Sequence, residues 1–322
     1  MWHWLTRTTA AQKVVNPTRA AMPAPLPVGA PVVAPQAAPL AVDPGGFIGW
    51  LLKAPPPAER RISLPELEAL GSIDQVIGSG QRIQELLPRA PAVIPQLLGA
   101  LRQRAPSLPA LVERVSKDLL LAAEVMRMAR SVAFSCDGEV HDLSRAIAAL
   151  GEQGLQRAIS RVLLRPLMQS GGGKLSVLAA ERLWDHTEHK AALCSVKAAA
   201  AGLDPFDGYM AGMLHSAGWT VALRLLDLRS PPPWPWSRKF AESLVARRDP
   251  LFGKVVGGWH VSPALDALAA EALELEPARR RSPLARALLD SDRETSSRLV
   301  AEAAAATAAS EPAAVAPADT LQ

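Results

Sequence analysis

The shortage of strand-forming residues is the feature that most constrains the fold of this chain. Its 322 residues include only one tyrosine and five phenylalanines, while alanine and leucine dominate. Sheets are enriched in aromatic and β-branched side chains, whereas alanine and leucine favour helices. Because 49% of the residues are hydrophobic, the chain can bury a substantial core. The composition therefore predicts an all-α protein.

The charges along the chain argue against nucleic acid as a partner. The 35 basic and 31 acidic residues give a formal charge of +4, and the one tight basic run is Arg279-Arg280-Arg281. A nucleic-acid surface gathers its basic residues on one face. We therefore interpret this run as a solvated helix end and predict no nucleic-acid partner.

The sequence favours a reducing compartment. Cys136 and Cys194 are far apart and outside any CxxC spacing, which predicts neither a disulfide framework nor a zinc knuckle. Residues 1–7 lack the apolar core of a signal peptide, and no later stretch supplies about 18 uninterrupted apolar residues. We expect a cytoplasmic protein without a membrane span.

The first part of the chain is expected to be unpacked. From about residue 16 to 44 the sequence is a mixture of proline, alanine and valine, and proline opposes helix formation. Trp2 and Trp4 precede this stretch and could form a docking peptide for a membrane surface or a partner. We favour a frayed terminus, because one short turn offers little binding area.

Helix-capping residues predict most of the helices. Ser63 and Glu66 form a capping box that starts a short helix through Leu70, and aspartates at 118, 142 and 204 are N-cap candidates. Gly151 and Gly202 are expected to end helices. Beyond residue 85 the predicted helices cover residues 91–104, 107–116, 118–129, 142–150, 153–168, 175–201, 205–216, 219–228, 238–247, 251–257, 263–275 and 282–309.

These elements predict five segments. They are a disordered Pro/Ala-rich N-terminal segment (1–44), a short helical lead-in (45–84), a helical domain (85–275), a C-terminal outer helix (276–309) and a disordered tail (310–322). Residues 171–173 are a glycine break without the spacing of a phosphate loop. The Pro/Trp loop at 231–236 could be a polyproline ligand, but we expect it to pack on its own domain.

The chemistry of the chain would depend on its histidines, which are His3, His141, His186, His189, His215 and His260. Two of them lie in distinctive contexts. His186 follows Leu183-Trp184-Asp185, and His215 lies in Ala211-Gly212-Met213-Leu214-His215-Ser216-Ala217-Gly218. Histidine is a common ligand of transition metals and a frequent acid or base, so this pair marks a candidate site.

This pair of motifs resembles the HDOD domain, a relative of the HD-type metal-dependent phosphohydrolases. Five further motifs resemble that family in the expected order and spacing. They are Ile94-Pro95, Ser116-Lys117-Asp118, Met128-Ala129-Arg130-Ser131, Ala146-Ile147 to Leu150-Gly151, and Gly258-Trp259 to Pro263. The resemblance spans roughly residues 85 to 270. It implies an HDOD-like helical bundle of two packed parts and a regulatory or scaffolding role in bacterial signal transduction.

The departure from the enzyme pattern is at Ser216. An HD phosphohydrolase holds its metals with histidines, an adjacent His-Asp pair and a further aspartate, whereas here the pair reads His215-Ser216. A serine hydroxyl is a weak neutral ligand. We therefore predict a vestigial site at His186, His215 and Ser216, with no catalytic residue, no metal and no cofactor. Both histidines are expected to pack at a helix crossing, bonded to backbone or to each other.

Three other residues are candidates for a binding cleft. Asp185 and His189 lie close to His186 in sequence, and Arg130 stands where the family tends to have asparagine. Two of them have a plainer interpretation, in which Asp185 belongs to a solvated helix face and Arg130 is a surface residue with a partly buried stem.

Three functions remain open at this point. The one we favour is a non-catalytic regulatory protein that binds a protein partner in a signalling pathway or a small regulator. The alternative is a divergent metal-dependent phosphohydrolase acting on a nucleotide or cyclic dinucleotide through His186 and His215. The third is an adaptor tethered through its N-terminal peptide.

Overall fold

The computed structural model describes residues 43–79, 83, 86–87, 112–113, 115–134, 142–169, 172–229, 231–274 and 282–310. Several sequence predictions lie outside these residues. They concern most of the N-terminal segment, the C-terminal tail, the helix at 91–104, most of the helix at 107–116, Cys136 and His141.

Every regular element among the described residues is a helix, and the one β-pairing there is an isolated bridge between Ala58 and Ser237, which confirms the predicted all-α class. The helices are α1 (Pro44–Leu51), α2 (Leu64–Ser79), α5 (Leu119–Phe134), α6 (Leu143–Gln169), α7 (Lys174–Ala200), α8 (Pro205–His215), α9 (Ala217–Leu228), α10 (Arg238–Val256), α11 (Pro263–Ala272) and α12 (Pro283–Ser310).

The predicted caps are present. Asp118, Asp142 and Asp204 accept hydrogen bonds from the backbone N–H groups of the helices that follow them, at 3.0, 2.8 and 2.9 Å. These bonds satisfy donors that a helix start leaves free. Gly151 interrupts α6 at φ 62°, and Gly202 follows α7 at φ 73°, a region that glycine enters without steric cost.

Three predicted helix ends are wrong, and the first is that of α5, which continues to Phe134 and does not end at Ala129. α2 continues to Ser79 and does not end at Leu70, because Ile73 is buried where α2 packs against α10. The two helices predicted at 238–247 and 251–257 are one helix, α10, which passes through Pro250. Proline removes one helical hydrogen bond. α10 packs against α1, α2, α9 and α11, so tertiary contacts stabilise the helix across this position.

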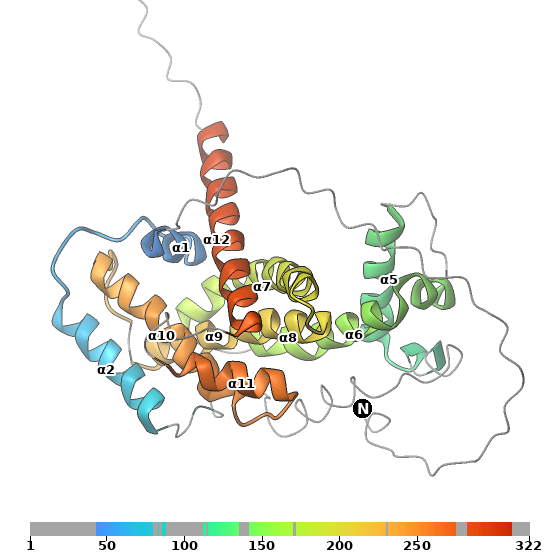
Figure 1. Cartoon of the computed structure of the whole chain (residues 1–322). Coiled ribbons are helices and arrows are strands. Elements are labelled where there is room, and N and C mark those ends of the chain that lie inside the picture. The colour runs from blue at the N-terminus through green and yellow to red at the C-terminus, as the bar shows by residue number, and fades with distance from the viewer. Residues whose placement is uncertain are drawn as a thin grey trace, which may run out of the picture.

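One hydrophobic core joins helices from all parts of the described chain. It includes Ile48 of α1, Ile73 of α2 and Leu284 of α12 together with the buried residues of α5 to α11. Figure 1 shows α7, α8 and α9 near the centre, α5 to one side, and α12 projecting away from the body. The first half of α12 is therefore part of the core, whereas residues 301–309 are largely exposed.

The Pro/Trp loop packs on its own domain, as predicted. Trp236 is buried, its indole N–H donates to the carbonyl of Pro232 at 3.0 Å, and its ring meets Phe240 edge-on. The neighbouring Trp234 lies 4.8 Å from Trp236 between ring centroids.

Glu66 ties the start of α2 to the start of α10. Its carboxylate is buried and accepts hydrogen bonds from the backbone N–H groups of Ser63 and Ser237, both at 2.7 Å. Arg60 adds two side-chain hydrogen bonds at 2.9 and 3.1 Å. The predicted capping box thus also bonds to a distant segment of the chain.

Replacing Glu66 with alanine should lower the free energy of unfolding by about 3 kcal/mol, because several buried donors lose their acceptor at once. Urea denaturation followed by circular dichroism measures this change. Glu68→Ala, on an exposed position of the same helix, is the matched control. Equal losses of stability from the two substitutions would contradict the role given to the Glu66 carboxylate.

Candidate functional site

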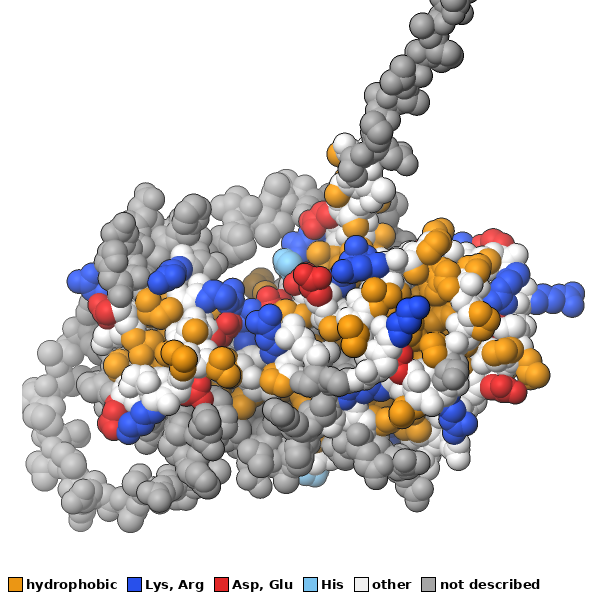
Figure 2. Space-filling model, turned by 180° about the vertical axis from the view of Figure 1, so that it is seen from behind, with side chains coloured by type: hydrophobic (Ala, Val, Ile, Leu, Met, Phe, Trp, Pro, Cys, Tyr) orange, Lys and Arg blue, Asp and Glu red, His pale blue; other side chains and the backbone are white. Residues whose placement is uncertain are grey.

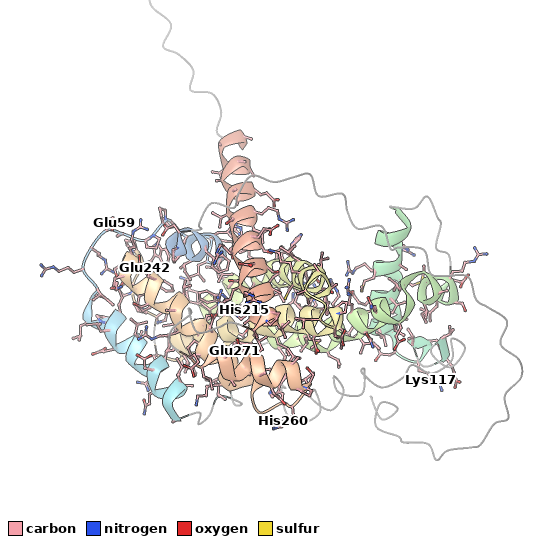
Figure 3. The ribbon with its side chains drawn as sticks, in the orientation of Figure 1. Glu59, Lys117, His215, Glu242, His260 and Glu271 are labelled. Atoms are coloured by element: carbon pink, nitrogen blue, oxygen red, sulfur yellow. The ribbon has the colours of Figure 1, made fainter. Side chains whose placement is uncertain are left out.

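The two predicted histidines lie at the packed crossing of α7 and α8. His186 is on α7 and His215 is the last residue of α8, and both side chains are buried. Two glycines on α8 permit the close approach. A Cβ atom at Gly212 would lie 2.4 Å from the Cα of Ala191, and one at Gly208 would lie 2.5 Å from the Cβ of Ala198. Figure 3 shows His215 deep among the helices, in contrast to His260 at the edge.

The partners of these histidines are side chains, which corrects the expectation of bonds to backbone or to each other. His215 Nε2 lies 2.9 Å from a carboxylate oxygen of Asp249, and its Nδ1 lies 3.2 Å from the ammonium of Lys190. His186 Nε2 lies 3.0 Å from the hydroxyl of Ser296. The reason is that α10 and α12 bring charged residues into the helix crossing, and these groups need buried polar partners.

Lys190 is at the centre of the site. Its ammonium lies 3.0 Å from Ser216 Oγ, 3.2 Å from His215 Nδ1 and 3.3 Å from Asp292 Oδ1. An ammonium has three N–H donors, so these three neighbours match its capacity. Burial lowers the pKa of Lys190 to about 8, against a smaller opposite effect of Asp292.

Arg248 links the two carboxylates of the site. Its Nε donates to Asp249 at 2.7 Å and its Nη1 donates to Asp292 at 2.6 Å. Burial opposes the charge of Asp292, but Arg248 and Lys190 outweigh it and hold the pKa of Asp292 well below its usual range. Two cations and two carboxylates thus balance in the core. We call the residues Lys190, His215, Arg248, Asp249 and Asp292 the buried charge cluster.

His186 borders this cluster as a neutral ring. Burial, reinforced by the nearby ammonium of Lys190, lowers the pKa of His186 well below its ordinary value. Its Nδ1 makes no hydrogen bond to any residue that the structure describes. The ring lies 5.0 Å from that of Phe47 on α1, so the N-terminal helix covers this side of the site.

Ser216 is held by its neighbours at the start of α9. Its hydroxyl lies 2.6 Å from that of Thr187 and accepts from Lys190. It therefore serves as a neutral hydrogen-bonding group at the position where the enzyme pattern has a carboxylate.

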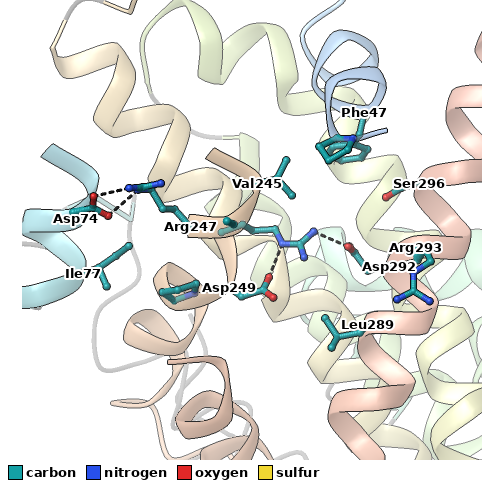
Figure 4. Close-up of a pocket in the computed structure, with 14 residues that line it drawn as sticks. Phe47, Asp74, Ile77, Val245, Arg247, Asp249, Leu289, Asp292, Arg293 and Ser296 are labelled. Carbon is teal, nitrogen blue, oxygen red and sulfur yellow. Dashed lines mark hydrogen bonds and ion pairs between the residues drawn. The ribbon is translucent and has the colours of Figure 1, made fainter. Parts of the chain in front are cut away.

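A cavity of about 610 Å³ opens beside the cluster. Its walls come from α1, α2, α10 and α12, and Asp249 and Asp292 border it from opposite sides (Figure 4). Phe47 and Ser296 lie at its upper rim, and Arg247 pairs with Asp74 at its outer end at 2.6 and 2.7 Å. Arg248, Asp249 and Asp292 of the cluster are thus among the residues that line the cavity.

The predicted cleft residues lie elsewhere. Asp185, His189 and Arg130 are exposed, and none of them lines this cavity. The imidazole of His189 bonds to the backbone carbonyl of Asp185 at 2.9 Å, as expected for a solvated helix face. Of the predicted residues, the structure therefore brings together His186, His215 and Ser216 only.

Four residues of the candidate site were not predicted from the sequence: Lys190, Arg248, Asp249 and Asp292. One signal was available, since Lys190 follows His186 by four residues and thus shares its helix face. The two aspartates come from α10 and α12, and nothing local marks them as neighbours of α7.

Two features of the described residues bear on function. No group of three or more His, Cys, Asp and Glu side chains among them could hold a metal ion. Within the same ranges no helix combines the length and hydrophobicity needed to cross a bilayer.

Comparison with known proteins identifies one family. Residues 87–230 match the HDOD domain. This segment contains Lys190, His215 and Ser216, whereas Asp249 and Asp292 lie beyond it. A crystal structure of an HDOD domain protein with unknown function from Geobacter sulfurreducens is similar at 18% identity and a TM-score of 0.46, covering 76% of this chain and 96% of that one. No curated protein matches the chain.

Replacing Asp292 with asparagine should lower the free energy of unfolding by about 3 kcal/mol, because Arg248 and Lys190 lose a buried counter-charge. Asp290→Asn, on an exposed position of α12, is the control and should change it by less than about 0.5 kcal/mol. Chemical denaturation of both variants checks this. A difference within error between them would contradict the proposed charge balance.

The lowered pKa of Lys190 predicts a pH dependence. Between about 8 in the folded protein and 10.5 in the unfolded chain, the unfolded chain binds more protons at this residue. The contribution of Lys190 to the free energy of unfolding therefore increases by about 1.4 kcal/mol per pH unit as the pH rises through that window. The measurement compares urea denaturation of the wild type and Lys190→Met at both ends of the window. Lys197→Met, in a partly exposed ion pair on the same helix, is the control for alkaline pH. A pH-independent difference for Lys190→Met would refute this prediction.

Proposed function

We propose that this protein, whose residues 87–230 form an HDOD domain, is a regulatory component of bacterial signal transduction that acts by binding and has no catalytic activity. The observation that carries this proposal is the ammonium of Lys190. It lies among the side chains at which an HD-type enzyme would hold its metal.

The charge of Lys190 opposes metal binding directly. A divalent cation at His215 and Asp292 would lie within a few ångströms of the ammonium, and like charges repel strongly in a buried site. The side chains that could bind a metal already have other partners, since Asp292 pairs with Arg248 and His215 bonds to Asp249. Ser216 supplies no negative charge to offset the metal. The cluster therefore offers no place for the metal-activated water that the phosphohydrolase mechanism needs.

Binding is the function that remains. The cavity beside the cluster has the size of a small-molecule site and combines apolar walls with a few charged groups. A small regulator or a segment of a protein partner fits this chemistry. The proposed setting is the cytoplasm, which agrees with the free, buried thiol of Cys194.

The metal content of the purified protein tests the proposal. Elemental analysis after incubation with Mn²⁺ or Mg²⁺ should find background levels of metal, and a phosphodiester substrate should not be hydrolysed. Near-stoichiometric metal that disappears in His215→Ala would overturn the proposal in favour of a divergent phosphohydrolase.

A double variant, Lys190→Ala with Ser216→Asp, makes the same test from the opposite direction. It removes the ammonium and restores the His-Asp pair, so we expect it to bind Mn²⁺ where the wild type does not. Ser216→Asp alone keeps the ammonium and is the matched control. If the control bound metal as well as the double variant, Lys190 would not be the cause of metal exclusion.

A further inference from the structure

We infer that a groove between α5 and α6 receives an acidic, amphipathic helix of a protein partner. This inference rests on the proposed binding function and adds to it a second surface, separate from the cavity beside the buried charge cluster, together with the chemistry of its partner. The groove encloses about 550 Å³, and its main lining residues are Leu120, Arg127, Arg161, Val162, Arg165 and Trp184. We call it the α5–α6 groove.

The groove has an apolar edge that faces solvent. Leu119 and Leu120, in the first turn of α5, are 83% and 73% exposed. Val162 and Pro166 of α6 and the ring of Trp184 continue the apolar surface inside the groove. In Figure 2 hydrophobic and basic side chains lie side by side on this part of the molecule, at the left of the view. Two adjacent exposed leucines beside a groove are typical of an interaction site.

The charge of the groove is unbalanced. Three guanidinium groups and one carboxylate, that of Glu124, line it. Arg127 and Arg161 both bond to Glu124, and Arg161 also pairs with Glu188. Arg165 bonds to the neutral amide of Gln169 and lies over the ring of Trp184, 5.5 Å from its centroid. Arg165 is therefore the group best able to bind a carboxylate of a partner.

A helix is the shape that this surface fits. The walls of the groove are helices, and the apolar face of a third helix packs into such a groove with anchors one turn apart. Acidic residues beside those anchors would meet Arg165 and Arg127. Nucleic acid fits less well, because exposed leucines contribute nothing to phosphate contacts.

The terminal segments of this chain do not have the required sequence. Residues 1–42 contain Arg7, Lys13 and Arg19 and no acidic residue, so their charge has the wrong sign. Residues 311–322 contain Glu311 and Asp319, but Pro312 and Pro317 oppose a helix of the necessary length. Neither terminal segment therefore fits the groove, and the occupant that we infer is a helix of another protein.

Selection from a displayed library of random peptides, about four helical turns long, against the full-length protein tests the inference. We expect the selected peptides to combine leucine-like residues at helical spacing with aspartate or glutamate. A labelled selected peptide should bind Arg165→Glu and Leu120→Ser about tenfold more weakly than the wild type. Its affinity should also fall as salt is added.

Matched variants elsewhere on the surface control for general effects. Leu228 on α9 is 72% exposed and Arg298 on α12 is an exposed helical arginine, so Leu228→Ser and Arg298→Glu should bind the peptide like the wild type. Circular dichroism of each variant confirms that it is folded.

Three outcomes would overturn the inference: no binders, binders without acidic residues, or binding that Arg165→Glu and Leu120→Ser leave unchanged. If the wild type bound single-stranded DNA and Arg165→Glu did not, the occupant of the groove would be nucleic acid and not a helix. Tighter peptide binding after removal of residues 311–322 would indicate that the tail of the chain is the occupant. None of these results bears on metal content, so the proposed function and this inference fail separately.

Discussion

The balance of charge at the centre of the molecule is the constraint on which the rest of the structure depends. Lys190, Arg248, Asp249 and Asp292 are buried on three helices, and each alone would carry a large desolvation cost. Together they form three ion pairs, because Asp292 pairs with both Lys190 and Arg248 and Asp249 pairs with Arg248, and His215 bonds to Asp249. The relative positions of α7, α10 and α12 are therefore fixed by electrostatics as well as by packing.

Under the proposed function, this arrangement lets a helix crossing that carries the histidines of the phosphohydrolase pattern do without a metal. A metal centre in the interior of a helical bundle is a source of positive charge that its carboxylates require. In this chain the positive charge is covalently attached, as the side chain of Lys190, and the carboxylate of the His-Asp pair is replaced by the Ser216 hydroxyl. Under the proposed function, this side-chain cation takes the place of a bound ion, and the neighbouring surfaces serve recognition.

The sequence was informative where local chemistry decides the outcome. Asp118, Asp142 and Asp204 cap helices because capping involves only the next few residues. His186 and His215 could be paired through their motifs, and the close contact of α7 with Gly208 and Gly212 agrees with that pairing. The acidic half of the site could not be predicted, because Asp249 and Asp292 approach Lys190 only after long-range packing. Pro250 failed as a helix breaker for the same reason, since packing overrides a local preference.

The position of Asp292 in the sequence has a consequence for how the protein is made. During synthesis Lys190 and Arg248 leave the ribosome well before Asp292, and until α12 is complete the core contains two cations with one carboxylate. The segment that matches the HDOD domain cannot complete this balance from its own residues. The docking of α12 therefore completes this charge balance, and it can occur only after Asp292 has emerged from the ribosome.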